Sequence, residues 1–393
     1  MALNRKKANV KQNPKANYKV PGSQLYVTRL SNLWRLFNRN KTDKTKRGLK
    51  ARIYFFSILT TPLQWIQALW LKLRLRSVDL SKASPVFILG HWRSGTTHIH
   101  YTLAQDQQFT YLDNFQSFFF NICMLGGWTK HLLGRWVPST RPMDNVEMTL
   151  LKPQEEEQVL SNITHAAGVG SFYFPRNREY FYQYNLFKGI SPREYRRWKK
   201  YYNYVLECIH VMGKGRRLLL KNPNNTARAP QLLELYPQAK FVYIHRNPYR
   251  VYLSTKHLHR AVLRSQSLQE ISEEEEDRII IENYRLIMQG YLDTRAAIPE
   301  GQLVEIAYDD IGTEQEMDVY QEIYQTLNLG DWETVRPKIA AYLDTKKGYK
   351  KNAFVPIAPE TVALIQKEWG FAFEEFGYDL EYKDNTQTTP AES

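Results

Sequence analysis

The stretch PVFILGHWRSGTTHIHYTL, residues 85–103, decides the fold of this chain. Its first six residues form a short apolar run bounded by Pro85 and Gly90, as expected of a buried strand. A turn with a second glycine follows, and a helix begins near Thr97. Such a turn curls the backbone so that its N–H groups and the helix N-terminus surround an anion. The stretch therefore predicts an anion-binding loop between a strand and a helix.

Three further apolar runs have the length of buried strands, and helical stretches separate them. The runs are residues 217–222, 240–246 and 302–311; the helical stretches are 97–106, 194–212, 227–236, 248–265 and 268–297. Strands that alternate with helices form parallel sheets covered on both faces. We therefore expect an α/β, P-loop-like, three-layer fold with a central parallel sheet flanked by helices, preceded by an N-terminal helical leader.

The loop has the spacing of a phosphate loop but lacks that loop's lysine. The pattern is G-x-x-x-x-G-T-T, and Thr96 stands where a Walker A loop has Lys. That Lys reaches the β and γ phosphates, so a conventional ATPase or GTPase is disfavoured. The predicted ligands of a single terminal anionic group are Arg93, Ser94, Gly95, Thr96 and Thr97. Arg93 adds a fixed charge with fork geometry.

Positive charge is concentrated at the N-terminus. Of the 54 Lys and Arg residues, 14 lie within residues 1–50, together with a single acid, Asp43. The rest of the chain is close to neutral, so a uniformly basic nucleic-acid binder is excluded. Two cysteines exclude a disulfide framework. Residues 1–22 are expected to form a mobile basic tail. Residues 384–393 are expected to form a second mobile tail, which is not basic.

Residues 23–80 are expected to form a basic, amphipathic and apolar helical leader. Residues 24–38 place an apolar stripe on one helix. Residues 53–73 have the length of a bilayer span, but polar residues such as Pro62 and Gln64 favour a pair of buried or interfacial helices. Two interpretations remain open for residues 1–73: a peripheral membrane surface, or helices that cover the main domain.

Two motifs in this order resemble the sulfotransferase family, which uses 3′-phosphoadenosine 5′-phosphosulfate (PAPS). The first is the Arg-Ser-Gly-Thr-Thr loop, in the form found in the bacterial branch. The second is KFVYIHRNPYRVYLSTKHL, about 150 residues later. The resemblance implies that Arg246 and Ser254 bind the 3′-phosphate of the nucleotide. It covers roughly residues 85–375, and the family domain is expected over 85–380.

Other segments extend the resemblance. Residues 218–237 resemble a K-S-P-x-H-T-A-R stretch of the bacterial branch, with Lys221 in place as a catalytic candidate, but Asn222 and Asn225 depart from the pattern. Residues 346–354 resemble the basic loop over the nucleotide, which makes Lys350 and Lys351 candidate ligands.

A general base should take the proton of the acceptor hydroxyl. The segment PQEEEQVL, residues 153–160, resembles an acidic motif of the bacterial branch and makes Glu155 and Glu157 candidates. An ordinary helix start explains the same acids. His98 is a further candidate, although its position on the first turns of the helix favours a structural role.

The resemblance implies a sulfotransferase that moves the sulfuryl group of PAPS to a hydroxyl acceptor without a metal. Aromatic segments between the two motifs favour a hydrophobic alcohol, lipid or phenol. We expect a cytoplasmic enzyme, either free or peripheral on the inner face of a membrane; its oligomeric state is open. The alternatives are a P-loop-type small-molecule kinase, and a non-catalytic protein that binds nucleotide or a membrane surface.

Overall fold

The computed structural model describes residues 23–126, 130, 132, 149–347 and 354–383. Within these ranges five parallel strands form a sheet of order β2-β3-β1-β4-β5. The strands are β1 (Val86–Leu89), β2 (Phe109–Thr110), β3 (Arg217–Lys221), β4 (Lys240–His245) and β5 (Leu303–Ala307). The predicted parallel sheet is confirmed, and the four expected strands lie in it. The fifth, β2, has only two residues, too few to leave a periodic pattern.

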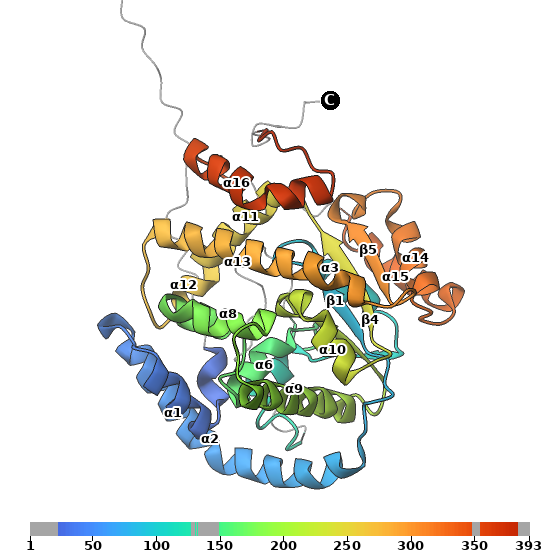
Figure 1. The fold of residues 1–393 in the computed structure, drawn as a ribbon. Helices are drawn as coiled ribbons and strands as arrows, with labels where there is room; N and C mark the ends of the chain where they lie inside the picture. Colours follow the sequence, from blue (N-terminus) through green and yellow to red (C-terminus); the bar gives the residue numbers. More distant parts are fainter. Residues whose placement is uncertain (1–22, 127–129, 131, 133–148, 348–353, 384–393) are drawn as a thin grey trace, which may run out of the picture.

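Helices surround the sheet (Figure 1). Before β1 lie α1 (Leu30–Arg39) and α2 (Arg47–Arg74); α3 (Thr96–Leu103) follows β1, and α4 (Asn114–Phe119) follows β2. Between β2 and β4 lie α6 (Glu156–Ile163), α7 (Gly170–Tyr173), α8 (Arg178–Leu186), α9 (Pro192–Met212) and α10 (Ala229–Leu235). After β4 follow α11 (Pro248–Leu258), α12 (Arg264–Gln266), α13 (Glu273–Thr294), α14 (Glu316–Thr326), α15 (Trp332–Asp344) and α16 (Pro359–Glu375). A π-helical turn, His259–Leu263, joins α11 to α12.

Two apolar cores lie on opposite faces of the sheet, because successive strand side chains alternate between its faces. Val86 and Ile88 of β1 belong to one core, together with residues of α3, α14 and α15. Phe87 and Leu89 belong to the other, together with residues of α9, α13 and α16. The layers are therefore helix, sheet and helix, as the alternating sequence pattern predicts.

The three central strands end close together, since β3 ends one residue before the level of Leu89 and β4 ends two residues beyond it. Ile88 of β1 pairs with Lys221 of β3, and Leu89 of β1 pairs with Tyr243 of β4. The chain moves from β1 to one side of the sheet for β2 and β3, and to the other side for β4. In open α/β sheets, ligands bind beyond the carboxyl ends of the strands at such a switch point. The loop after β1 lies at this position.

Gly90 ends β1 at a very close approach to β4. Its φ is +136°, and a Cβ atom there would lie 2.5 Å from the backbone oxygen of Ile244. Thr226, from the short 3₁₀ helix Pro223–Ala227 (η6), holds the same residue from the other side. Its Oγ1 accepts the Gly90 N–H at 2.8 Å and donates to the Gly90 oxygen at 3.1 Å. Backbone geometry and hydroxyl together fix where the loop begins.

The leader packs on the family domain. Leu25, Leu33 and Ile53 belong to the same core as Phe87 and Leu89. The expectation of a helix pair over residues 53–73 is wrong: one helix, α2, continues through Pro62. The hydroxyls of Thr60 and Thr61 donate to backbone oxygens one turn earlier, which keeps carbonyls near the proline bonded. No helix in the described ranges has the length and hydropathy needed to cross a bilayer.

Gly90→Ala tests the close approach at the end of β1. We expect it to lower the free energy of unfolding by at least about 1–3 kcal/mol, because alanine tolerates neither the positive φ nor the contact with Ile244. Gly48→Ala in α2 is the matched control: it meets no atom within 4 Å and should stabilise the helix by up to about 1 kcal/mol. Urea unfolding of both variants measures this. Equal midpoints for Gly90→Ala and wild type would contradict the geometry.

Candidate active site

The loop between β1 and α3 has the backbone geometry of an anion cradle. Gly95 precedes the first residue of α3 with φ +102°, and Arg93 is also left-handed at φ +73°. A Cβ atom on Gly95 would lie 2.5 Å from the ring of Tyr308, so only glycine fits. Ser94 and Thr96 are buried. The first N–H groups of a helix are free and project outward at its N-terminal end. In α3 that end is joined to the loop, so these groups point toward it.

The two sequence motifs meet in space. Arg93 Nε donates to the Ser254 hydroxyl of α11 at 2.8 Å, although 161 positions separate the two residues. Arg246, directly after β4, donates through Nη1 to the backbone oxygen of Arg93 at 3.0 Å. The predicted ligands of the 5′ and 3′ ends of a nucleotide thus form one connected cluster.

Positive charge is crowded in this cluster. Burial lowers the pKa of Arg246, and the neighbouring charges of Arg93 and Arg250 lower it further. The Arg246 guanidinium lies 3.9 Å from the ring centre of Tyr308, which follows β5 at the same sheet edge. A bound anion would relieve the repulsion between these cations. The donor set therefore suits a ligand with more than one negative group.

Lys221 and Glu155 form an ion pair beside the loop. Lys221 is the last residue of β3 and is 5% exposed, and its Nζ contacts Oε1 of Glu155. Glu155 immediately precedes α6 and its side chain is 13% exposed. The pair is largely buried, but the Glu155 carboxylate is still partly exposed to solvent. A proton acceptor and a cation therefore lie together at the carboxyl edge of the sheet.

Both carboxylate oxygens of Glu157 are bonded within the protein. Arg228 donates to both of its oxygens, at 2.7 and 2.9 Å, and both side chains are completely buried. Asn222 and the Gly168 N–H donate to the same carboxylate at 2.7 and 2.6 Å. Burial alone would raise the pKa of Glu157, but the Arg228 charge and these hydrogen bonds lower it. The carboxylate holds α6 to η6.

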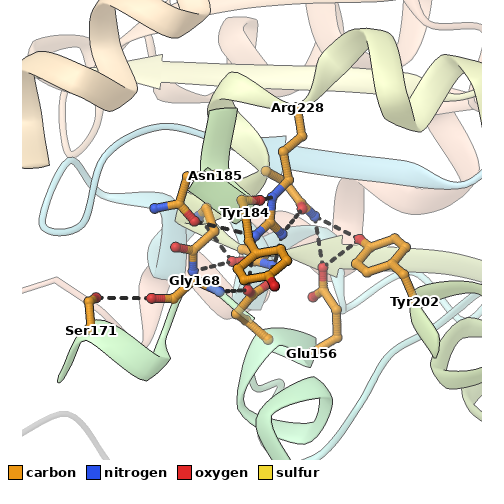
Figure 2. Close-up of polar contacts among 11 residues, drawn as sticks. Glu156, Gly168, Ser171, Tyr184, Asn185, Tyr202 and Arg228 are labelled. Carbon is orange, nitrogen blue, oxygen red and sulfur yellow. Dashed lines mark hydrogen bonds and ion pairs between the residues drawn. The ribbon is translucent and has the colours of Figure 1, made fainter. Parts of the chain in front are cut away.

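Glu156 points to a different set of partners. Its Oε1 accepts from the Tyr202 hydroxyl at 2.9 Å and from Asn225 at 2.8 Å (Figure 2). Its Oε2 is buried, with no hydrogen-bond partner in the described part of the chain. Burial raises the pKa of Glu156 to about 7, and the charges of Glu157 and Glu155 add to this effect. Asn222 and Asn225, which depart from the family pattern, therefore bind two successive glutamates.

The two histidines of α3 point to different sides. His98 Nε2 lies 2.5 Å from Glu316 of α14. His100 is completely buried, and burial holds its pKa well below the usual range, so it is neutral. Lys350 and Lys351 lie outside the described residues. Within the described residues, no group of three or more His, Cys, Asp or Glu side chains could hold a metal ion.

The structure thus brings together most of the residues that the sequence singled out. Arg93, Arg246 and Ser254 form one cluster, while Lys221 and Glu155 form a second at the same sheet edge. Sequence reasoning missed Tyr308, Glu156 and Tyr202. For Tyr308 a signal existed, since it lies near the carboxyl end of the predicted strand 302–311. For Glu156 and Tyr202 no such signal existed, because only the fold shows which face of α6 packs on which face of α9.

Two neighbouring glutamates should respond oppositely to one substitution. The raised pKa of Glu156 means that the folded state binds its proton more tightly than the unfolded state, where the pKa is 4.5. This contribution to stability is full below pH 4.5 and is lost as the pH rises through 7. Glu156→Gln should therefore exceed wild type in stability by less than about 1 kcal/mol at pH 5 and by on the order of 3 kcal/mol at pH 8.

Glu157→Gln should instead destabilise the protein by about 3–5 kcal/mol, because it leaves Arg228 buried without its counter-charge. Urea unfolding at pH 5 and pH 8 measures both variants. A pH-independent difference between Glu156→Gln and wild type would refute the assigned protonation.

Comparisons with known proteins are consistent with this geometry. A model described as the sulfotransferase family matches residues 85–334. Proteins of Mycobacterium bovis and Mycobacterium tuberculosis, both named omega-hydroxy-beta-dihydromenaquinone-9 sulfotransferase Stf3, are each 29% identical to this chain over 344 residues. The alignment covers 86% of this chain and 88% of each relative.

Solved structures share the fold. The crystal structure of sulfotransferase STF9 from Mycobacterium avium has a TM-score of 0.64 at 17% identity, and the match covers 91% of this chain and 99% of that one. Sulfotransferase STF1 from M. tuberculosis has a TM-score of 0.54, also at 17% identity, over 79% and 84% of the two chains. The family match spans more than half of this chain, from the residue before β1 through the loop and Arg246. This chain belongs to the sulfotransferase family.

Proposed function

We propose that this sulfotransferase takes PAPS as its donor and transfers the sulfuryl group to the hydroxyl of a hydrophobic lipid alcohol. The observation that carries the donor assignment is the contact chain from Arg246 through Arg93 to Ser254. It joins a strand-end cation, a phosphate loop and a helix hydroxyl. A nucleotide with phosphate at both its 3′ and 5′ positions would match this cluster, with the Arg93 loop toward one phosphate and Arg246 and Ser254 toward the other.

In this proposal each part of the cluster has one task. The loop N–H groups, Ser94, Gly95, Thr96 and Thr97 hold the 5′ end of the donor. Arg93 stabilises negative charge on the leaving phosphate. Arg246 and Ser254 bind the 3′-phosphate. Lys350 and Lys351 stay candidate ligands from the family resemblance alone.

Glu155 is the proposed general base. Its neighbours point elsewhere: Glu157 is occupied by Arg228, and Glu156 by Tyr202 and Asn225. Lys221 holds the Glu155 carboxylate in place and supplies a cation near the developing charge. His98 is bonded to Glu316 on the far side of α3, so we assign it a structural role.

The proposed step is a direct displacement at sulfur. The acceptor oxygen forms a bond to sulfur while the bond from sulfur to the 5′-phosphate oxygen breaks, and its electron pair stays on the phosphate. The acceptor proton goes to Glu155. Preorganised charges and positioning supply the rate enhancement, as in phosphoryl transfer.

Two observations support a lipid alcohol as acceptor. The relatives at 29% identity are named for a hydroxylated menaquinone, a lipid. In addition, α4 carries Phe118 and Phe119, both partly exposed. This helix is tied to the segment before Glu155, because Gln154 Nε2 donates to Asn114 Oδ1 at 3.1 Å. An apolar surface next to the proposed base favours an apolar acceptor.

The donor site can be tested with the expected product, adenosine 3′,5′-bisphosphate. Calorimetry should give micromolar binding to the full chain and much weaker binding of ATP–Mg²⁺. Arg246→Ala should weaken the bisphosphate roughly 10- to 100-fold, the usual effect of losing a charged hydrogen-bond partner. Arg285→Ala on α13, whose partner is Glu368, is the control and should bind normally.

Preference for ATP–Mg²⁺ would replace this proposal by the kinase alternative. Binding of neither nucleotide would leave a non-catalytic binding protein.

Glu155→Gln tests the base. With labelled PAPS and polyprenyl or long-chain alcohols in detergent micelles, we expect kcat to fall roughly 10²- to 10⁴-fold. Bisphosphate affinity should stay within twofold of wild type. His98→Gln is the matched control and should keep most of the activity. If the two variants behave in the reverse way, His98 is the base.

A further inference from the structure

The helix α2 turns an apolar face to the outside of the protein. Its large exposed side chains include Phe55, Leu59, Trp65, Ile66, Leu69 and Leu73, each between 58% and 72% exposed. At 3.6 residues per turn they share roughly 120° of the helix circumference. Figure 1 shows α2 along the outer edge of the molecule. Exposed apolar patches of this kind mark interaction sites.

The opposite face of α2 packs on the protein and is polar along its middle, between the buried apolar residues Ile53 and Leu71. Ser57, Gln64 and Gln67 are buried there. The Ser57 hydroxyl donates to the Tyr26 oxygen at 3.1 Å. Gln67 donates to the Phe120 oxygen at 2.7 Å and accepts the Met124 N–H at 2.8 Å. Along this middle part the helix is therefore inverted relative to an ordinary surface helix, whose apolar face meets the core.

These buried hydrogen bonds fix the rotation of the helix. Turning α2 so that its apolar face met the domain would strand the Gln67 and Ser57 partners without hydrogen bonds, which is unfavourable. Apolar side chains on the outer face are thus a consequence of specific packing on the inner face. Because the inner face of α2 is packed on the domain, only its outer face is available for contact with another apolar surface.

Charge identifies that medium. Between Asp43 and Asp79 the chain has no acidic residue. Its basic residues stand at both ends of the apolar face: Lys44, Lys46, Arg47, Lys50 and Arg52 before it, and Lys72, Arg74 and Arg76 after it. An apolar stripe with tryptophans and basic ends matches the boundary between acyl chains and anionic headgroups.

We propose that α2 is a membrane-docking helix that lies in the plane of a bilayer containing anionic lipids. The apolar face enters the acyl boundary, the basic ends contact headgroups, and the polar face stays bonded to the domain. This inference does not depend on the reaction or on the acceptor. It names one occupant, the bilayer surface; a second copy of this chain is the rival that the experiment separates.

Vesicle sedimentation with the full chain tests the proposal. The protein should pellet with vesicles of 30% phosphatidylglycerol in phosphatidylcholine, and at least tenfold less with phosphatidylcholine alone. The double variant Trp65→Glu and Leu69→Glu should lose at least tenfold of the binding while keeping every basic residue. The double variant Val355→Glu and Leu380→Glu, which changes exposed apolar residues elsewhere, should bind like wild type.

Two further measurements make the result decisive. Thermal unfolding and bisphosphate affinity of the α2 variant should equal those of wild type, since both altered side chains are exposed. Failure of wild type to pellet, or equal pelleting of the α2 variant, overturns the proposal. Sedimentation equilibrium that shows a dimer lost only in the α2 variant, without vesicle binding, would give the face to a second copy.

Discussion

Parallel pairing of β1 with both β3 and β4 is the constraint on which the site depends. It brings the carboxyl ends of three strands close together at one edge, and each end carries a candidate group: the loop after Leu89, Lys221, and Arg246. The approach of Gly90 to Ile244 and the Thr226 hydroxyl set the start of the loop within that edge. Residues far apart in sequence meet there because each directly follows or ends one of these parallel strands.

Much of the nucleotide side of the site could be read from the sequence, because it is encoded locally. A buried strand, a glycine turn and a helix follow one another within residues 85–103, and a strand, Arg246 and a helix with Ser254 repeat that logic. Each motif fixes its own geometry through backbone preferences. Only the contact between them needs the fold, and the parallel sheet supplies it.

The acidic segment could not be resolved in this way. Glu155, Glu156 and Glu157 are three identical residues in a row, and their roles differ only through partners from other elements. Lys221 comes from β3, Tyr202 from α9 and Arg228 from the turn after η6. The orientation of α2 was equally open, because its sequence offers both an apolar and a polar face. Buried hydrogen bonds of Gln67 and Ser57 decide which face packs, and periodicity carries no information about them.

The completely buried pair of Glu157 and Arg228 restrains Glu155, two positions before Glu157. Glu157 bonds α6 to Asn222, Gly168 and Arg228, so the first turn of that helix cannot move without exposing a charged network. Glu155 stands at the entrance of this turn and is restrained with it. The conformational entropy of the Glu155 carboxylate is therefore lost when the chain folds. It is not lost again in the activation step of a reaction at that carboxylate.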